Sequence, residues 1–221
     1  MEDKNIYNLR LLHLSFIGKI IAGFTHEIKN YIAIIKESAG LIEDLIKLGK
    51  VTKSDSGQCL EITRSIEEQI EKTNSLFRYL NRFAHRMDNE LSAFNVNESL
   101  EELIALLTRS ANQKKISLEK DFQRDIPSIT SNPSMLQFLV FHFLEEKIAR
   151  LDKNSRLIVK TAFLNNSVEI RIIPEGHFLT IEMGKEKLPH DTLNSIIRQL
   201  GVSISQGAGE ETAITLPSAS T

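Results

Sequence analysis

The sequence has one cysteine, no long apolar run and almost no net charge, and each of these absences narrows its possible functions. The single thiol, at Cys59, excludes an internal disulfide framework and suits a reducing cytoplasm. No run approaches the roughly 20 apolar residues that span a bilayer, and the first ten residues do not form a signal peptide. A net charge of -2 provides no basic face for nucleic acid. We therefore expect a cytoplasmic protein without membrane or nucleic-acid partners.

The residues around His26 lie in a long amphipathic run, from about residue 9 to residue 48. A lone helical histidine is usually an ordinary surface residue. His26 lies outside the apolar stripe of the run, so its ring should be exposed and open to a partner. The steps of three and four residues along the stripe are typical of a helix pair or bundle. The stripe comprises Phe24, Ile28, Ile32, Ile35, Ala39, Ile42 and Ile46.

A second helix should follow a short polar connector, residues 49–57, so that the two helices form an antiparallel hairpin. A lone hairpin cannot cover its own apolar stripe, which predicts a homodimeric four-helix bundle. We interpret residues 87–92 as a hinge and divide the chain into domains at 1–90 and 91–221. The first helix should begin near residues 7–9. The inward positions of the second helix should be Leu60, Ile66, Ile70, Thr73, Leu76 or Phe77, Leu80 and Phe83.

The second half alternates helical and strand patterns, which predicts an α/β sandwich and an α+β chain overall. Asn97 should cap its first helix and Asn132 its second, with Pro133 as the first helical residue. Asn165-Asn166 should form a hairpin turn, and residues 207–209 another. The expected helices cover residues 98–112, 133–151 and 189–200, and the expected strands 116–122, 156–163, 167–173, 178–183, 202–205 and 211–216.

The string His26-Glu27-Ile28-Lys29-Asn30 resembles the H-box of sensor histidine kinases, although Tyr31 stands where that family usually has proline. The second half resembles the family's GHKL, or Bergerat, ATP-binding domain through residues 94–100, 126–137 and 211–217. The resemblance implies that His26 is a phosphoacceptor on a dimerising hairpin. It further implies that Glu27 accepts a hydrogen bond from the ring or acts as a base, that Lys29 meets phosphate oxygens, and that Asn30 orients a water. Ordinary surface roles for these three neighbours stay open.

The nucleotide-binding residues of that family are missing. Glu145 or Glu146 lies where an asparagine should bind magnesium, and a carboxylate adds negative charge beside a polyanion. Pro174 replaces the aspartate that reads adenine, two residues before Gly176. Between Gly176 and Gly201 only Gly184 appears, so the paired glycines of a phosphate-binding lid are absent. We therefore expect no bound cofactor and no metal site, and we doubt ATP binding.

Three functions follow. The first is a histidine phosphotransferase, a degenerate relative of the kinases that accepts a phosphoryl group on His26 from a response-regulator receiver and passes it to another, with Mg²⁺ supplied by the receiver. The second is an ATP-dependent kinase with a divergent pocket. The third is a non-catalytic dimer that binds a signalling partner. Receivers should dock around His26, against exposed apolar residues such as Ile21 or Ala22.

Overall fold

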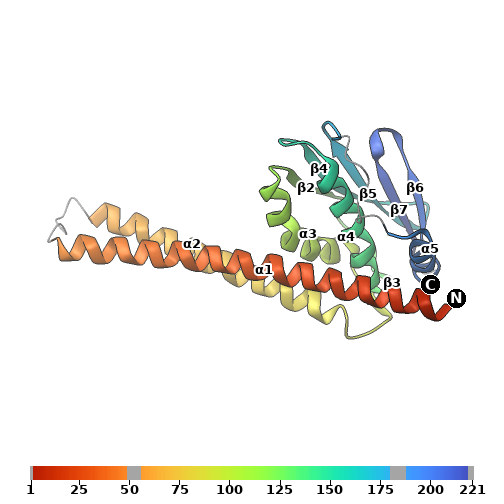
Figure 1. Cartoon of the computed structure of the whole chain (residues 1–221), viewed down its shortest axis with the longest axis horizontal. Coiled ribbons are helices and arrows are strands. Elements are labelled where there is room, and N and C mark those ends of the chain that lie inside the picture. The colour runs from red at the N-terminus through yellow and green to blue at the C-terminus, as the bar shows by residue number, and fades with distance from the viewer. Residues whose placement is uncertain (1, 49–55, 180–187, 219–221) are drawn as a thin grey trace.

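The protein begins with a long antiparallel helical hairpin, followed by a mixed α/β domain (Figure 1). The computed structural model describes residues 2–48, 56–179 and 188–218. Helices α1 (Glu2–Lys47) and α2 (Ser56–His85) confirm the predicted hairpin. Helix α1 begins earlier than residues 7–9, because the expectation followed the apolar stripe, which starts later in the sequence. Most of the expected connector, residues 49–55, lies outside the described residues.

The apolar stripe of α1 is only partly covered within one chain. Phe24 is buried, but Ile32 is 55% exposed and Ile46 61% exposed. On α2, Phe83 is buried as predicted, and of the alternatives Leu76 and Phe77 it is Leu76 that is buried. Leu60 and Ile70 were expected inside and are exposed in the single chain. The two helices therefore bury one flank of each stripe against each other and leave the other flank to solvent.

The described part of the second domain contains two sheets, three α-helices and the short 3-10 helix η1. The larger sheet has the order β2-β4-β5-β7-β6, with β2 parallel to β4 and every other pairing antiparallel. Strands β1 and β3 form a separate antiparallel pair. The elements are β1 (Ser92–Phe94), α3 (Val96–Gln113), β2 (Ser117–Phe122), β3 (Ile129–Ser131), α4 (Pro133–Arg150), β4 (Arg156–Leu164), β5 (Ser167–Glu175), α5 (His190–Leu200), β6 (Ser203–Gln206), η1 (Ala208–Glu210) and β7 (Thr212–Pro217).

Most predicted turns and caps are confirmed. Asn132 accepts a hydrogen bond from the backbone N–H of Met135 at 2.8 Å and caps α4. Asn165 and Asn166 have φ angles of 50° and 58°, which the mirror-image turn of a tight hairpin requires, and they join β4 to β5. The predicted turn at 207–209 joins β6 to β7 through the short helix η1.

Three predictions in this domain were wrong or incomplete. Asn95, not Asn97, caps α3, because the Asn97 side chain donates to the carbonyl of Gln123 and accepts from Thr161. Strands β1 and β3 were both missed, and β1 begins at Ser92 within the predicted hinge, since three residues are too few to show a period. The strand expected at 178–183 is represented only by a bridge between Phe178 and Leu151, and residues 180–187 lie outside the description.

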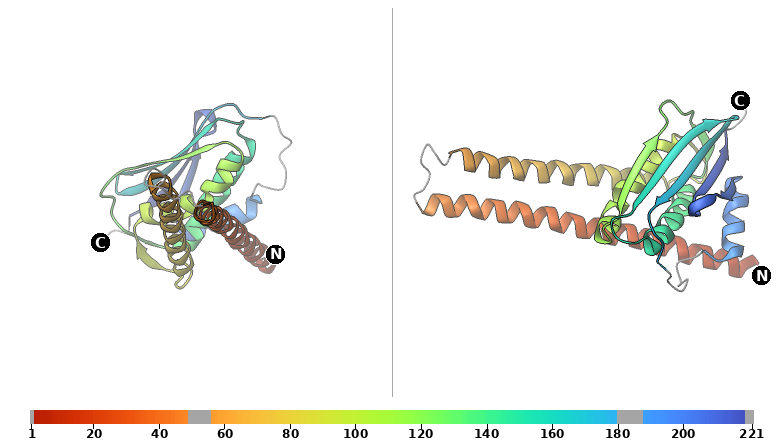
Figure 2. Two further views of the ribbon diagram at one scale, coloured as in Figure 1. Left: turned by 90° about the vertical axis from the view of Figure 1, so that its left-hand side faces the viewer. Right: turned by 90° about the horizontal axis from the view of Figure 1, so that it is seen from above.

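Helix α4 is buried on nearly all sides because it lies between the sheet and α1 (Figure 2). Its sequence is correspondingly apolar around most of its circumference, as a fully enclosed helix requires. The right-hand view of Figure 2 shows the far part of the hairpin projecting well beyond the second domain. The core between α4 and the sheet is built mainly from Leu136, Leu139, Val140, Leu144, Val159, Val168, Ile170, Ile172 and Ile214.

The near half of the hairpin is docked onto the second domain. The ring of Phe16 on α1 lies 4.7 Å from that of Phe141 on α4, measured between centroids. Arg86 at the end of α2 donates to the fully buried carboxylate of Glu102 on α3 at 2.8 Å. His13 on α1 is half-buried, with Nε2 3.0 Å from Oγ of Ser134 on α4. Aromatic packing and a buried ion pair thus join the two parts.

Candidate functional site: a histidine beside a groove between α1 and α3

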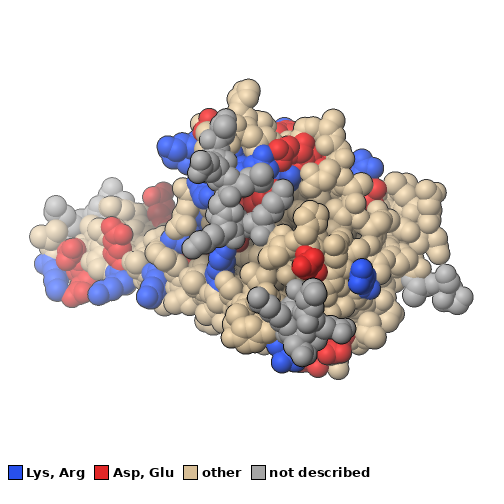
Figure 3. All heavy atoms as spheres, turned by 45° about the vertical axis from the view of Figure 1, so that its right-hand side comes forward, with Lys and Arg blue, Asp and Glu red and all other residues tan. Residues whose placement is uncertain are grey.

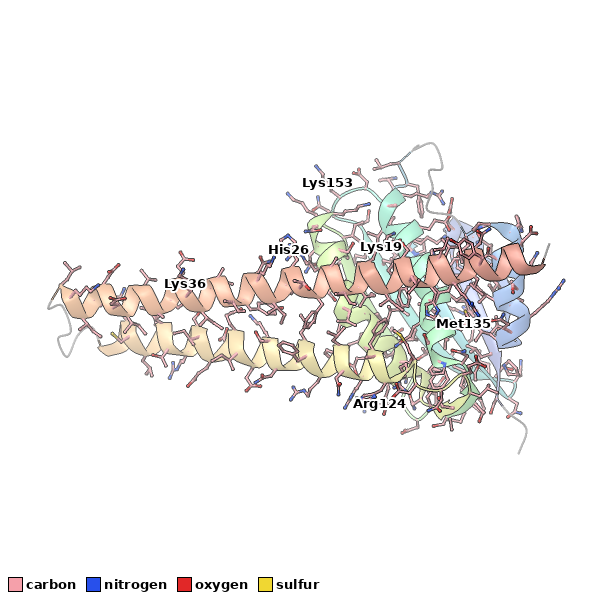
Figure 4. All side chains as sticks on the ribbon, turned by 60° about the horizontal axis from the view of Figure 1, so that its bottom comes forward. Lys19, His26, Lys36, Arg124, Met135 and Lys153 are labelled. Atoms are coloured by element: carbon pink, nitrogen blue, oxygen red, sulfur yellow. The ribbon has the colours of Figure 1, made fainter. Side chains whose placement is uncertain are left out.

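His26 is exposed on α1, as predicted, and lies at a groove between α1 and the second domain. Figure 4 shows its ring projecting from α1 on the side where the helical layer of the second domain begins. The groove has a volume of about 350 Å³. It is lined by Lys19, Ala22, Gly23, His26, Leu106, Leu107, Arg109, Ser110, Gln113, Phe141 and Glu145. An imidazole at such a place is accessible and has an apolar floor beside it.

Two cations share the groove with His26, and a carboxylate holds each of them. Nζ of Lys19, two helical turns before His26, lies 2.6 Å from Oε2 of Glu145 on α4. Nη1 of Arg109 on α3 lies 2.7 Å from Oε2 of Glu27 on α1. Each ion pair crosses between the hairpin and the second domain, so the groove is framed by both parts of the chain.

Glu27 is engaged by residues other than its histidine neighbour. Besides the bond from Arg109, it accepts a hydrogen bond from the phenol of Tyr31, one turn later on α1. Burial, that hydrogen bond and the negative charge of Glu27 raise the pKa of Tyr31 to about 12. Tyr31 is the residue that stands where the family usually has proline. Its hydroxyl therefore adds a partner for Glu27 that proline cannot provide.

The other predicted site residues lie where a helix must place them. Lys29 and Asn30 are exposed on α1, and Asn30 lies one turn beyond His26. Ile21 and Ala22, which we predicted as docking residues, are also exposed, and Ala22 lines the groove. Lys19, Arg109 and Tyr31 were missed. For Lys19 a signal existed, because a spacing of seven residues from His26 puts both side chains on one helix face.

The two candidate replacements for the metal-binding asparagine point in different directions. Glu145 belongs to the His26 groove, whereas Glu146 lines a separate cavity of about 250 Å³ on the other side of α4. Of the two, only Glu146 therefore faces this cavity. The cavity lies below the roughly 300–1,000 Å³ typical of small-molecule sites. Its described lining is His142, Phe143, Glu146, Leu188, His190, Leu193 and Gln206.

Arg150 and Lys147, two described basic residues close to Glu146, are already paired. Nη1 of Arg150 lies 3.3 Å from Oε1 of Glu146 and 2.6 Å from Oε2 of Glu210, and this pairing lowers the pKa of Glu210. Nζ of Lys147, almost fully buried, lies 3.5 Å from Oε2 of Glu210. Burial lowers the pKa of Lys147. Both cations near Glu146 are thus matched by carboxylates rather than left for phosphates.

The remaining predicted nucleotide positions serve the fold. Pro174 lies in β5 opposite Leu157, and it offers no side-chain acceptor for an adenine amino group. Gly176 has a φ of 149°, and a Cβ placed there would lie 2.2 Å from Oγ of Ser155, so a close approach to its neighbour requires glycine. Gly184 lies outside the described residues. With the paired cations beside Glu146, the described residues do not fit ATP.

Other kinds of site find no support in the part of the chain that is described. Within residues 2–48, 56–179 and 188–218, no group of three or more His, Cys, Asp or Glu side chains could hold a metal ion. None of the described helices combines the length and apolarity needed to cross a bilayer. On the face shown in Figure 3, acidic and basic side chains are interspersed.

Similar proteins identify the architecture. The chain is 23% identical over 202 residues to the cell-division control histidine kinase PdhS of Brucella abortus (strain S19). This alignment covers 90% of this chain and 19% of the relative. The same values hold for PdhS of Brucella anthropi. The chain has a histidine-kinase-like architecture. This histidine-kinase-like chain spans about a fifth of the length of the curated relatives it matches, and no protein-family model matches it.

A solved structure supports the fold of this histidine-kinase-like chain. The catalytic domain of histidine kinase ThkA superimposes with a TM-score of 0.52 at 12% identity, over 59% of this chain and 99% of that domain. At this identity the likeness concerns the fold. It confirms the predicted α+β architecture, in which helices precede a sandwich of the GHKL type.

Proposed function

We propose that this chain is a histidine phosphotransferase of a two-component phosphorelay. It works as a homodimer in the cytoplasm. His26 accepts a phosphoryl group from the aspartyl phosphate of one receiver domain and passes it to the aspartate of another. The two domains keep their predicted limits of 1–90 and 91–221.

The observation that carries this proposal is the contrast between the two candidate sites. The imidazole of His26 is exposed beside a groove that contains two cations, Lys19 and Arg109. At the nucleotide positions, Arg150 is paired with Glu146 and Glu210, so among the described residues it is not left for phosphates, and Pro174 offers no side-chain acceptor for adenine. An acceptor without a fitting ATP site needs a phosphorylated protein as its donor.

The transfer requires few groups from the chain itself. A neutral imidazole attacks phosphorus with a nitrogen lone pair. The new N–P bond forms as the P–O bond to the donor aspartate breaks, and that carboxylate leaves with the electron pair of the broken bond. The donor's magnesium neutralises charge on the phosphoryl oxygens. Lys29 meets those oxygens, and Asn30 orients a water when the phosphohistidine is hydrolysed.

Two alternatives keep specific support. The relatives are named histidine kinases, which favours an ATP-dependent enzyme whose divergent pocket uses other groups. The poor fit of the described residues to ATP, with Pro174 in β5, is also what a non-catalytic dimer that binds a signalling partner would have.

One experiment separates these functions. The purified chain is incubated either with labelled ATP and Mg²⁺ or with receiver domains that carry a labelled aspartyl phosphate, and acid-labile label on the chain is measured. We expect label from a receiver and none from ATP. Label from ATP establishes the kinase, and no label from either donor across the organism's receivers favours the binding-only dimer.

Substitution identifies the acceptor. His26→Gln should abolish labelling, because glutamine has no nucleophilic ring nitrogen. His85→Gln is a matched control, since His85 is also an exposed histidine on the hairpin and lies near the end of α2. The acceptor assignment fails if His26→Gln keeps its label or if His85→Gln loses it.

A further inference from the structure

Arg109 connects the second domain to the site on α1 in two ways. It lines the groove beside His26, and it also lines a second hollow between α1, α2 and α3, where Glu27 and Tyr31 are found. Its guanidinium therefore lies at the boundary between the two hollows. From there it donates to Glu27, the residue next to His26 in the sequence.

Arg109 can exchange its partner Glu27 for another acceptor. Both side chains keep some solvent exposure, 15% for Arg109 and 25% for Glu27. Separating two such largely buried charges costs free energy unless each of them finds another partner. If Arg109 leaves, Glu27 keeps the hydrogen bond from the Tyr31 hydroxyl, so its carboxylate does not lose every donor.

A phosphoryl group on His26 would be a stronger partner for Arg109 than Glu27 is. It carries more negative charge than a carboxylate and presents three acceptor oxygens. The planar fork of guanidinium matches such a group in bidentate fashion. Lys19 is more distant along α1 and is held by Glu145, which leaves Arg109 as the groove cation next to the turn that contains His26.

We infer that Arg109 is a phosphoryl-binding residue supplied to His26 by the second domain: it is held by Glu27 when the histidine is free and moves to the phosphoryl oxygens when the histidine is phosphorylated. The inference rests on the proposed function for the origin of the phosphoryl group, but not for the contact itself. It gives the second domain a role at the site although its nucleotide positions do not fit ATP.

The contact can be tested on the full chain without a receiver. Phosphoramidate transfers its phosphoryl group to imidazole as its own P–N bond breaks and ammonia leaves. The side-chain Nε–H signal of Arg109, assigned by its loss in Arg109→Lys, is followed by NMR during this treatment. We expect the signal to shift in the wild type as phosphohistidine forms, and to stay in place in His26→Gln. An unchanged signal in the phosphorylated wild type would overturn the inference.

Transfer from a phosphorylated receiver gives the functional measurement. Arg109→Gln should slow labelling of His26 roughly tenfold or more, because it removes a hydrogen bond to a charged group. The labelling rate of Arg109→Lys should lie between those of the wild type and Arg109→Gln, since lysine keeps the positive charge but lacks the planar fork of guanidinium. Arg124→Gln is the control, because Arg124 is exposed on the opposite side of the hairpin from His26 in Figure 4.

The two proposals fail in different ways. If receivers label wild type and Arg109→Gln at equal rates and the Arg109 signal does not shift, the inference is wrong and the phosphotransferase stands. If no receiver labels the wild type but phosphoramidate shifts the Arg109 signal, the contact stands and the phosphotransferase is wrong. Circular dichroism of each variant establishes that the fold is retained.

Discussion

The rings of Phe16 and Phe141 lie 4.7 Å apart although they belong to different parts of the chain, one on α1 of the hairpin and one on α4 of the second domain. Phe16 also contacts Phe83 of α2 and Phe138 of α4, with centroids 5.4 and 5.7 Å away. Both Phe16 and Phe141 are fully buried. A single side chain thus joins three helices at the interface behind the His26 groove.

Phe16→Ala should destabilise the chain by about 3–5 kcal/mol, because it removes a buried ring and leaves a cavity among three others. The free energy of unfolding is measured by urea denaturation. Leu164→Ala is the control, since Leu164 is 53% exposed at the end of β4 and should change stability by less than about 0.5 kcal/mol. Equal effects of the two substitutions would show that the ring cluster does not hold the parts together.

Stability should fall in mild acid because of His142. Burial, together with the positive charge of Lys19, lowers the pKa of His142 from 6.5 to about 4 in the folded chain. The unfolded chain therefore takes up the proton first as the pH drops. The contribution of this group to stability is complete above about pH 6.5 and is lost progressively down to about pH 4, at roughly 1 kcal/mol per pH unit.

His142→Phe should reduce this acid sensitivity, since the new ring does not titrate and its neighbours Phe138 and Phe141 are aromatic. The measurement is the free energy of unfolding at several pH values between 4 and 7.5. Leu164→Ala removes no titratable group at an exposed site and should leave the pH profile as in the wild type. A profile for His142→Phe as steep as that of the wild type would contradict the assignment.

Lys147 and Glu210 should respond unequally to substitution. Glu210→Gln removes the carboxylate that faces a nearly fully buried ammonium, and we expect a loss of about 1–3 kcal/mol, moderated by the 38% exposure of Glu210. Lys147→Met should be neutral or slightly stabilising, because methionine suits the buried site and Glu210 keeps Arg150. Thermal unfolding compares the two. Strong destabilisation by Lys147→Met would show that the buried charge itself is needed.

The proposed dimer depends on the exposed flank of the α1 stripe. The double variant Ile32→Glu, Ile46→Glu should place charges in the interface between two hairpins. It should therefore convert the dimer into a monomer of 25.0 kDa. Sedimentation velocity measures the mass directly. Leu164→Glu adds a charge at an exposed site away from the hairpin and should leave the mass unchanged. A wild type that sediments as a single chain would overturn the dimer.

The sequence predicted the fold where local chemistry decides it. Asn132 with Pro133 fixed the start of α4, and the pair Asn165-Asn166 fixed a tight hairpin. It misplaced the cap of α3, because Asn95 and Asn97 are both capable caps, and they are distinguished by the bonds of Asn97 to the distant Gln123 and Thr161. The short strand β3 depends on pairing with β1, which no local pattern contains.

Only those features of the site that depend on α1 alone could be predicted from the sequence. The exposure of His26 follows from its position relative to the apolar stripe. The link from Glu27 to Arg109 joins residues 82 positions apart, so no spacing rule on α1 could indicate it. The role of Tyr31 as a hydrogen-bond donor was likewise invisible, because the sequence shows only that it replaces a proline.

The packing of α1 against α4 limits how the second domain can be exchanged between proteins. A cut near residue 91 would separate the two predicted domains, yet it would also strip α4 of Phe16 and Ile20, which are fully buried beside it. Phe138 and Phe141 would then face water in any transplanted second domain. A functional chimera must therefore carry the near half of α1 together with the domain that follows it, so the unit of exchange is discontinuous in the sequence.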